Sequence, residues 1–453
     1  MLLEKFKLNP FLIVFFLFPV AFVIGQAAIS IIFIYLIILF IKDFKKIKFL
    51  INTEDYYIIF FFLIIIFSSI WNYFSDNEDY RSIISSLLYI KFLIPYYLIR
   101  STKIDDLFFK NLRIIFSLTS IIILFVIVDT IFQYHNPSKL DLFGYRSTLD
   151  NANRLTGPFG NDEAIPGSFL IKVGFITLIF FNSYFFYKLK KKIYISSILS
   201  MNVVFLYVIL ITGERMAFMM SILAFSLLFL ILNRQKINLI FSAIISIFVI
   251  FVVIEKNPYI KSRYEIMGKF LFSKSYIAYD VAKVKDEHIE KKNPINFFNN
   301  QWGAHYLTSL EILKDKPLFG AGIKGFRMDC KKKEYENIRS LSFYKRCSSH
   351  PHNIYFEFLS ETGLVGSFFI LTFLFIIIIK NYKLITFLKK KKLNYEDQII
   401  LSIYIAALVV LISILWPIRS SGSFFSNFNG SMIWINIYWI LLIEKYFKKN
   451  NKI

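Results

Sequence analysis

The chain has 453 residues, of which 56% are hydrophobic, and it carries a formal net charge of +22. A soluble domain averages about 45–50% apolar residues, and the excess here is concentrated in blocks of about 20 residues, the length that crosses a bilayer as a helix. The positive charge sits in short clusters between these blocks, which indicates membrane topology and a lysine-rich coding bias and argues against a nucleic-acid partner.

The apolar blocks predict an all-α polytopic membrane protein, because backbone groups in lipid must be satisfied within each segment. We expect about 12 transmembrane helices, at 10–24, 27–41, 56–74, 82–99, 114–133, 164–187, 193–212, 216–233, 237–254, 362–380, 398–416 and 431–443.

The charges of the short loops predict the orientation. Lys and Arg in the segments 1–9, 42–55, 100–113, 188–192, 234–236, 380–397 and 444–453 far outnumber those in the alternate short loops. Short cytoplasmic loops carry such an excess. We therefore expect both termini in the cytoplasm and one large loop outside.

This orientation divides the chain into an N-terminal membrane domain (1–254), a large outer loop (255–361) and C-terminal membrane helices (362–453). All five histidines and both cysteines, Cys330 and Cys347, fall on the outer side. An outer compartment permits a disulfide between them, worth about 3 kcal/mol for a loop of this length. The alternative is two free thiols, and the spacing does not match a metal site.

Four outward segments are unusually polar: 134–163, the short turn 212–215, the loop 255–361, and 416–427. Arg215 is the most informative residue, because a tight turn between two membrane helices needs glycine but not arginine. A guanidinium near the membrane surface suits phosphate or carboxylate, although it could also be an interface anchor. Arg154 and Arg419 have the same two interpretations.

The end of the large loop carries the strongest candidate for proton transfer. Pro351 suits the first turn of a helix that Ser349 could cap, which would put His352 and Phe356 on one helix face near the membrane. A neutral imidazole there can take a proton from a hydroxyl, although most surface histidines are inert.

Two further features are weaker. The stretch 320–325 fits the dinucleotide pattern G-x-G-x-x-G, but it follows a helix-like segment rather than a strand, so we interpret it as a tight glycine turn. Lys91 and Lys172 fall within predicted spans, where charges are costly, and are candidate contacts for a lipid phosphate or side chains that snorkel to the surface.

Several of these segments together resemble a known family. The stretch His352-Asn353, nine residues, then Gly363-Leu-Val-Gly366 is similar to the signature of the bacterial O-antigen ligase and O-antigen polymerase superfamily. The segment 304–322, the turn Thr212-Gly-Glu-Arg215 and the turn 419–427 resemble that family's landmarks in the same order.

The resemblance implies a glycosyltransferase of the bacterial inner membrane whose site faces the periplasm. The donor is a glycan on undecaprenyl pyrophosphate, and the acceptor is a hydroxyl of the lipid A core (ligase) or of a lipid-linked glycan (polymerase). No cofactor or metal is implied, and membrane lipid, a flippase and a chain-length regulator are the expected partners.

The resemblance also implies roles for individual residues. His352 matches the proposed general base, and Arg215 matches the turn arginine that contacts the donor pyrophosphate, with Arg419 and Arg154 as helpers. Contacts to the acceptor or within the loop are expected from Asn353, Trp302, Lys345 and Arg346.

Glu214 departs from the small residue expected before the turn arginine, and no role is carried onto it. Glu357 and Glu361 lie in the family segment, with roles open between orienting His352 and capping. A transporter or flippase of lipid-linked substrates is the alternative function. It predicts repeated hydropathy and polar residues at the membrane midplane, whereas the polar landmarks here lie on the outer turns.

Overall fold

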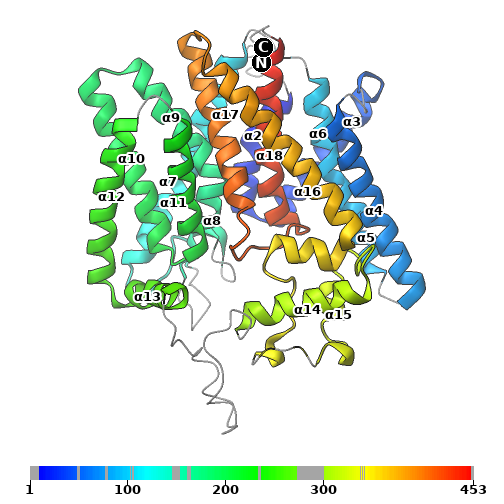
Figure 1. The fold of residues 1–453 in the computed structure, drawn as a ribbon. Helices are drawn as coiled ribbons and strands as arrows, with labels where there is room; N and C mark the ends of the chain where they lie inside the picture. Colours follow the sequence, from blue (N-terminus) through cyan, green and yellow to red (C-terminus); the bar gives the residue numbers. More distant parts are fainter. Residues whose placement is uncertain are drawn as a thin grey trace.

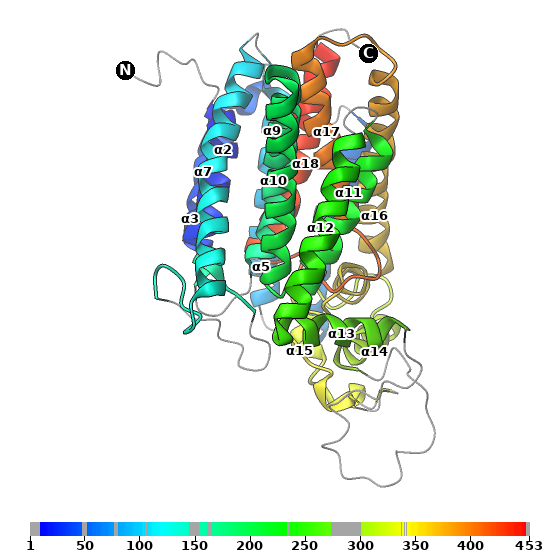
Figure 2. The same cartoon turned by 90° about the vertical axis from the view of Figure 1, so that its left-hand side faces the viewer.

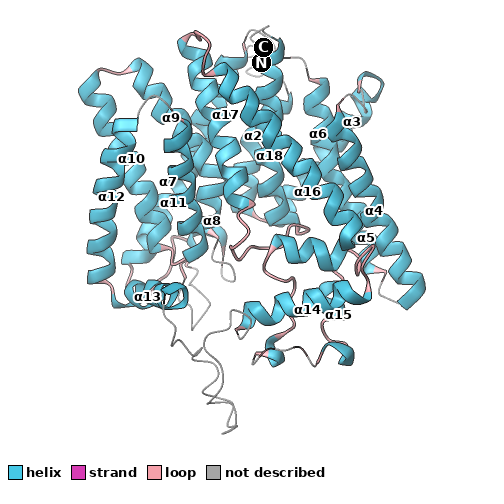
Figure 3. Ribbon diagram, viewed as in Figure 1, coloured by secondary structure: helices cyan, strands magenta, loops and turns pink. Residues whose placement is uncertain are grey.

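The computed structural model describes residues 10–47, 52–76, 80–102, 104, 107–144, 154–160, 165–232, 236–272, 300–336, 338, 340 and 342–449. Within these ranges the fold is helical, with no sheet (Figure 3). The membrane part consists of α2 (Pro10–Ile24), α3 (Gln26–Asp43), α4 (Thr53–Asp76), α5 (Arg81–Tyr89), α6 (Leu93–Ser101), α7 (Phe108–His135), α8 (Pro166–Phe169), α9 (Phe175–Lys188), α10 (Lys191–Ile211), α11 (Arg215–Ile231), α12 (Lys236–Lys256), α16 (Ile354–Leu388), α17 (Tyr395–Ile414) and α18 (Asn427–Lys449).

Nine helices or runs of helices in the described part are long and apolar enough to cross a membrane. Val14–Ile24 and Arg215–Ile231 are apolar but shorter. The last predicted span falls on α18, which carries several polar residues and lies almost wholly inside the bundle. Each of the twelve predicted spans therefore corresponds to a helix or to a run of consecutive helices.

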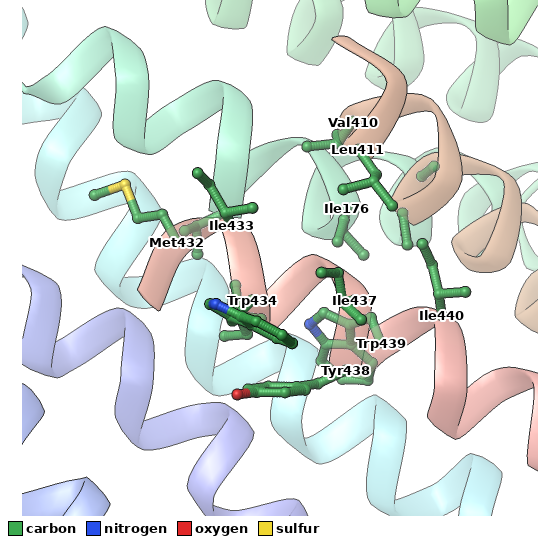
Figure 4. Packing of buried hydrophobic residues seen from close by; sticks show 14 of the residues in the cluster. Ile176, Val410, Leu411, Met432, Ile433, Trp434, Ile437, Tyr438, Trp439 and Ile440 are labelled. Carbon is green, nitrogen blue, oxygen red and sulfur yellow. The ribbon is translucent and has the colours of Figure 1, made fainter. Parts of the chain in front are cut away.

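The centre of the bundle is formed by α17 and α18, which are buried around nearly their whole circumference. A helix that is apolar on nearly all sides, as α17 is, belongs in such an interior. Trp434 of α18 stacks on Phe92 with ring centroids 5.7 Å apart. Figure 4 shows Ile176 of α9 and Val410 and Leu411 of α17 packed around the same helix.

The two ends of the bundle differ. Figures 1 and 2 place the start of α2 and the end of α18 at one end. The opposite end carries α13 (Pro258–Phe272), α14 (Gln301–Asp315) and α15 (Phe326–Asp329), which lie outside the membrane helices. The start of α2 and the end of α18 therefore lie at the end of the bundle opposite α13, α14 and α15.

Candidate functional site

His352 immediately precedes α16 rather than lying within it. Its backbone has φ +61°, in the left-handed region, and Asn353 is the N-cap of the helix, whose side-chain oxygen accepts from the Tyr355 amide at 2.9 Å. The prediction that the helix begins near Pro351, capped by Ser349, was therefore wrong. The left-handed turn ends any helix before Asn353, so the His352 ring is set by the turn and not by a helix face.

The His352 ring lies among three other side chains. Its Nε2 is 3.0 Å from the Ser348 hydroxyl, and its ring centroid is 4.2 Å from that of His350 and 5.2 Å from that of His305. Burial, together with the nearby His350, His305 and Arg154, lowers the pKa of His352 to about 3. Burial also lowers the pKa of His305 to about 4. His352 is consequently a neutral imidazole at physiological pH.

The C-terminal outer turn, 415–426, is bound to this histidine motif along its length. The Ser421 amide donates to the His352 carbonyl at 2.8 Å, and the Asn353 side chain donates to the Pro417 and Arg419 carbonyls at 2.8 and 3.2 Å. Farther along, the Glu357 carboxylate accepts from the Phe424 amide at 2.7 Å and from the Ser423 hydroxyl. Glu357 therefore anchors the turn.

A second group of residues surrounds the glycine of the turn 212–215. The Leu155 amide donates to the Thr212 carbonyl at 3.0 Å, and this bond joins the segment that follows α7 to this turn. A Cβ built on Gly213, whose φ is +72°, would lie 3.3 Å from Arg263 Nε and 3.6 Å from Arg154 Cγ. Arg154 and Arg263 thus lie together beside Gly213, two residues before Arg215.

Arg154, one of the arginines beside Gly213, interacts electrostatically with His352. The positive charge of Arg154 lowers the pKa of His352, where burial has the largest effect, and it also acts on Arg215. Arg263 of α13 was not singled out from the sequence; its Nε donates to the Gly213 carbonyl at 3.1 Å.

Glu214 is hydrogen-bonded to the backbone of residues 167 and 168. Its two carboxylate oxygens accept from the amides of Gly167 and Ser168 at 2.6 and 3.0 Å, at the start of the helical run that begins at Pro166. Burial raises the pKa of Glu214 to about 7, against these hydrogen bonds and the charge of Arg154. The residue that departs from the family pattern therefore joins the 212–215 turn to α8.

Arg419 is not part of the arginine group around Gly213. It is buried, one of its terminal nitrogens contacts the Met220 sulfur of α11, and its Nε has no hydrogen-bond partner in the described part of the chain. Burial lowers the pKa of Arg419 to about 10. The positive charge of Arg419 also interacts with the buried Lys172. Arg154 thus acts on Arg215, whereas the described neighbours of Arg419 are Met220 and Lys172.

The two membrane lysines make equivalent contacts at the start of α18. Lys91 donates to Asn427 Oδ1 at 2.6 Å, and Lys172, in the π-helical turn Leu170–Gly174, donates to Asn429 Oδ1 at 2.5 Å. Neither lysine snorkels freely, since each binds an amide of the 427–429 segment. Single π-helical turns within α-helices are rare, and many of those that occur lie at functional sites.

The predicted loop residues lie in different surroundings. Trp302 is 37% exposed at the start of α14, and Lys345 lies over the Tyr344 ring. Arg346 donates to the Cys330 carbonyl at 3.0 Å and pairs with Glu336 at 3.3 Å. Arg346 therefore has internal partners in the loop.

Cys330 and Cys347 are joined as a disulfide, with Cα atoms 5.3 Å apart. The bond fixes the residue directly before Ser348. It therefore connects the body of the outer loop to the histidine turn.

The 320–325 stretch forms a turn, as predicted. Its backbone is held by α4 and α5: the Asn72 side chain donates to the Gly320 carbonyl at 2.8 Å and Ser82 donates to the Ile323 carbonyl at 3.0 Å. Glu361 accepts from the Lys324 amide at 2.8 Å. Like Glu357, Glu361 anchors a neighbouring turn and does not contact His352 in any described interaction.

Residues 200–371 match the family model Wzy_C, described as O-antigen ligase. This part of the chain, residues 200–371, is an O-antigen ligase domain by that match. This match covers the 212–215 turn, the outer loop and the histidine motif, so the family resemblance is confirmed for this part. No curated protein matches the chain.

The O-antigen ligase domain leaves Arg154, Lys172 and Arg419 outside its bounds, and hydrogen bonds bring their segments to it. Sequence reasoning missed His305 and Ser348 as neighbours of His352. The run of polar residues from Ser348 to Asn353 was a signal for Ser348, whereas His305 is distant in sequence. Among the described residues, no three His, Cys, Asp or Glu side chains are arranged to share a metal ion.

Proposed function

We propose that this O-antigen ligase family protein transfers a glycan from undecaprenyl pyrophosphate to a sugar hydroxyl, at the periplasmic face of a bacterial inner membrane. The observation that carries the proposal is the position of Arg154. Its segment is hydrogen-bonded to the turn that holds Arg215, and its charge reaches both Arg215 and His352. A cationic site for a leaving group and a candidate base are thereby neighbours.

His352 acts as the general base in this proposal. The acceptor hydroxyl gives its proton to the imidazole while its oxygen attacks the anomeric carbon from the side opposite the pyrophosphate. The bond from that carbon to the pyrophosphate oxygen breaks, so the configuration inverts. An anionic donor beside Arg154 offsets that positive charge and raises the basicity of His352 when donor is bound.

The arginines stabilise the departing lipid pyrophosphate. Charge develops on the leaving oxygen as the bond breaks, and guanidinium groups fixed beforehand stabilise it without reorganisation. Arg215 and Arg154 contact one part of the pyrophosphate, and the buried Arg419 supplies a second positive charge. The mechanism uses no metal, so a chelator should not change turnover.

The orientation is supported by two independent features. The lysine-rich short loops lie at the end of the bundle where α2 begins and α18 ends, and short cytoplasmic loops are rich in lysine. The disulfide lies at the opposite end, where an oxidising compartment would preserve it.

Reconstitution tests the proposal. Purified protein is combined with a lipid-linked repeat unit, with and without lipid A core, and the products are separated on a gel. A ladder on the lipid carrier indicates a polymerase, and a product that requires the core indicates a ligase. His352→Ala should remain folded in the membrane and form neither product, whereas retained turnover would remove His352 from its role.

A further inference from the structure

A cleft of about 300 Å³ lies between α16 and α18, at the end of the bundle opposite His352. The ends of these helices are neighbours there, since Lys380 of α16 pairs with Glu444 of α18 at 2.9 Å. The cleft is lined by Lys380, Lys383, Leu384, Phe387, Glu444 and Lys448.

The charges of the cleft do not cancel. Lys380 is paired with both Glu54 and Glu444, and Glu444 is shared with Lys448. Both carboxylates are buried and are thus committed to these pairs. Lys383 is exposed and has no ion-pair partner among the described residues. Three lysines face the two carboxylates of Glu54 and Glu444, and Lys383 leaves the rim of the cleft with an excess positive charge.

The floor of the cleft is apolar and continues along the membrane surface of α16. Phe387 is 43% exposed, and Lys391 covers one of its faces at 4.6 Å. Phe375, Ile379 and Lys383 are spaced four residues apart, so they form one stripe on the helix. Phe375 and Ile379 are 64% and 37% exposed, which gives an apolar track leading away from the charged rim.

We propose that this cleft binds an anionic phospholipid of the surrounding leaflet. The phosphate diester lies between Lys383 and Lys448, the glycerol backbone rests on Leu384 and Phe387, and an acyl chain follows Phe375 and Ile379. Lysines beside a membrane helix attract anionic headgroups. The apolar floor distinguishes this site from one for a free anion, which would need polar walls. The lipid holds α16 against α18, and its binding does not depend on the function proposed for the opposite end.

The test compares thermal unfolding of the full chain in nanodiscs of phosphatidylcholine with and without phosphatidylglycerol. Phosphatidylglycerol should raise the Tm of the wild type, because a ligand that binds only the folded state stabilises it. The double variant Lys383→Gln/Lys448→Gln should lose most of that rise. Lys392→Gln is the matched control, because Lys392 is an exposed lysine at the same end that does not line the cleft.

Native mass spectrometry gives a second readout, in which wild-type protein and the Lys392→Gln variant retain a phosphatidylglycerol adduct that the double variant loses. Equal Tm rises in all three proteins would overturn the proposal in favour of general surface charge. The same rise on adding inorganic phosphate to phosphatidylcholine nanodiscs would overturn it in favour of a free anion. Equal Tm values in the two lipid compositions would show that no such site exists.

Discussion

The backbones of Gly320 and Gly363 lie directly against each other. A Cβ on Gly320 would come within 2.5 Å of the Gly363 nitrogen, and a Cβ on Gly363 within 2.6 Å of the Gly320 nitrogen. Gly363 interrupts α16 with φ +64°, and the amides of Leu364 and Val365 beyond it donate to the carbonyls of Pro317 and Leu318. Pro317 and Leu318, directly before the 320–325 turn, therefore accept hydrogen bonds from the amides that follow the kink in α16.

Gly363→Ala should destabilise the protein by well over the ~1–2 kcal/mol that a left-handed φ costs an L-residue, because its Cβ would also overlap backbone atoms. Thermal unfolding in detergent measures the loss. Gly144→Ala is the matched control, since Gly144 has φ +82° but nothing within 4 Å of a built Cβ. Equal losses in the two variants would show that the close approach contributes nothing.

Ser348→Ala should lower the transfer rate about fivefold while leaving the Tm nearly unchanged. The Ser348 hydroxyl orients the His352 ring through Nε2, and a hydrogen bond of about 1 kcal/mol corresponds to about fivefold in rate. Ser349→Ala is the comparison, since its hydroxyl bonds His350 instead. An unchanged rate in Ser348→Ala would mean that the turn backbone alone sets the ring.

The acid limb of the pH profile of kcat/KM should lie below the ordinary histidine pKa of about 6.5. The free protein holds His352 neutral through burial and the charges of His350, His305 and Arg154, so activity should persist at pH 5.5. An acid limb at or above 6.5 would contradict this environment. Arg154→Gln removes one positive charge, so it should raise the pKa of His352 and move the acid limb to higher pH.

The free energy of unfolding should fall at acidic pH, because His352 and His305 have lowered pKa values in the folded protein. A folded-state pKa below the unfolded value means that the unfolded chain binds more protons below pH 6.5. The contribution of His352 and His305 is therefore constant above that pH, and stability falls as the pH drops from 6.5 toward 4. His305→Phe should weaken this fall, which can be followed by Tm at stepped pH values.

The sequence revealed much of the fold because the bilayer imposes a simple rule on helix length, and all twelve apolar blocks became helices. The sequence also singled out four polar segments between the helices, but it did not show which of them contact one another. The left-handed turn at His352 was missed because Pro351 and Ser349 form a plausible helix start, and only the contacts of Asn353 with the 415–426 turn decide otherwise. The surroundings of Arg419, which contacts Met220, likewise depend on residues far away in the sequence and could not be predicted from it.

Arg215→Lys should reduce transfer by about ten- to a hundredfold, because a lysine keeps the charge but loses the planar pair of donors that matches a phosphate. Arg113→Lys, on α7 away from the turn, controls for the chemical change. If Arg215→Lys is fully active, positive charge alone is sufficient at the turn. The effect should appear in kcat more than in KM if the contact strengthens as the pyrophosphate leaves.

The double variant Cys330→Ser/Cys347→Ser should lose about 3 kcal/mol of stability, the chain-entropy value for a loop of this size, and should also lose activity. The bonded residues are 17 apart, and Cys347 directly precedes the Ser348 that contacts His352. Reductant should lower the Tm and turnover of the wild type toward those of the double variant without affecting the variant itself. A wild type that is unchanged by reductant, with its thiols shown by alkylation to be free, would mean that the histidine turn is held without the disulfide.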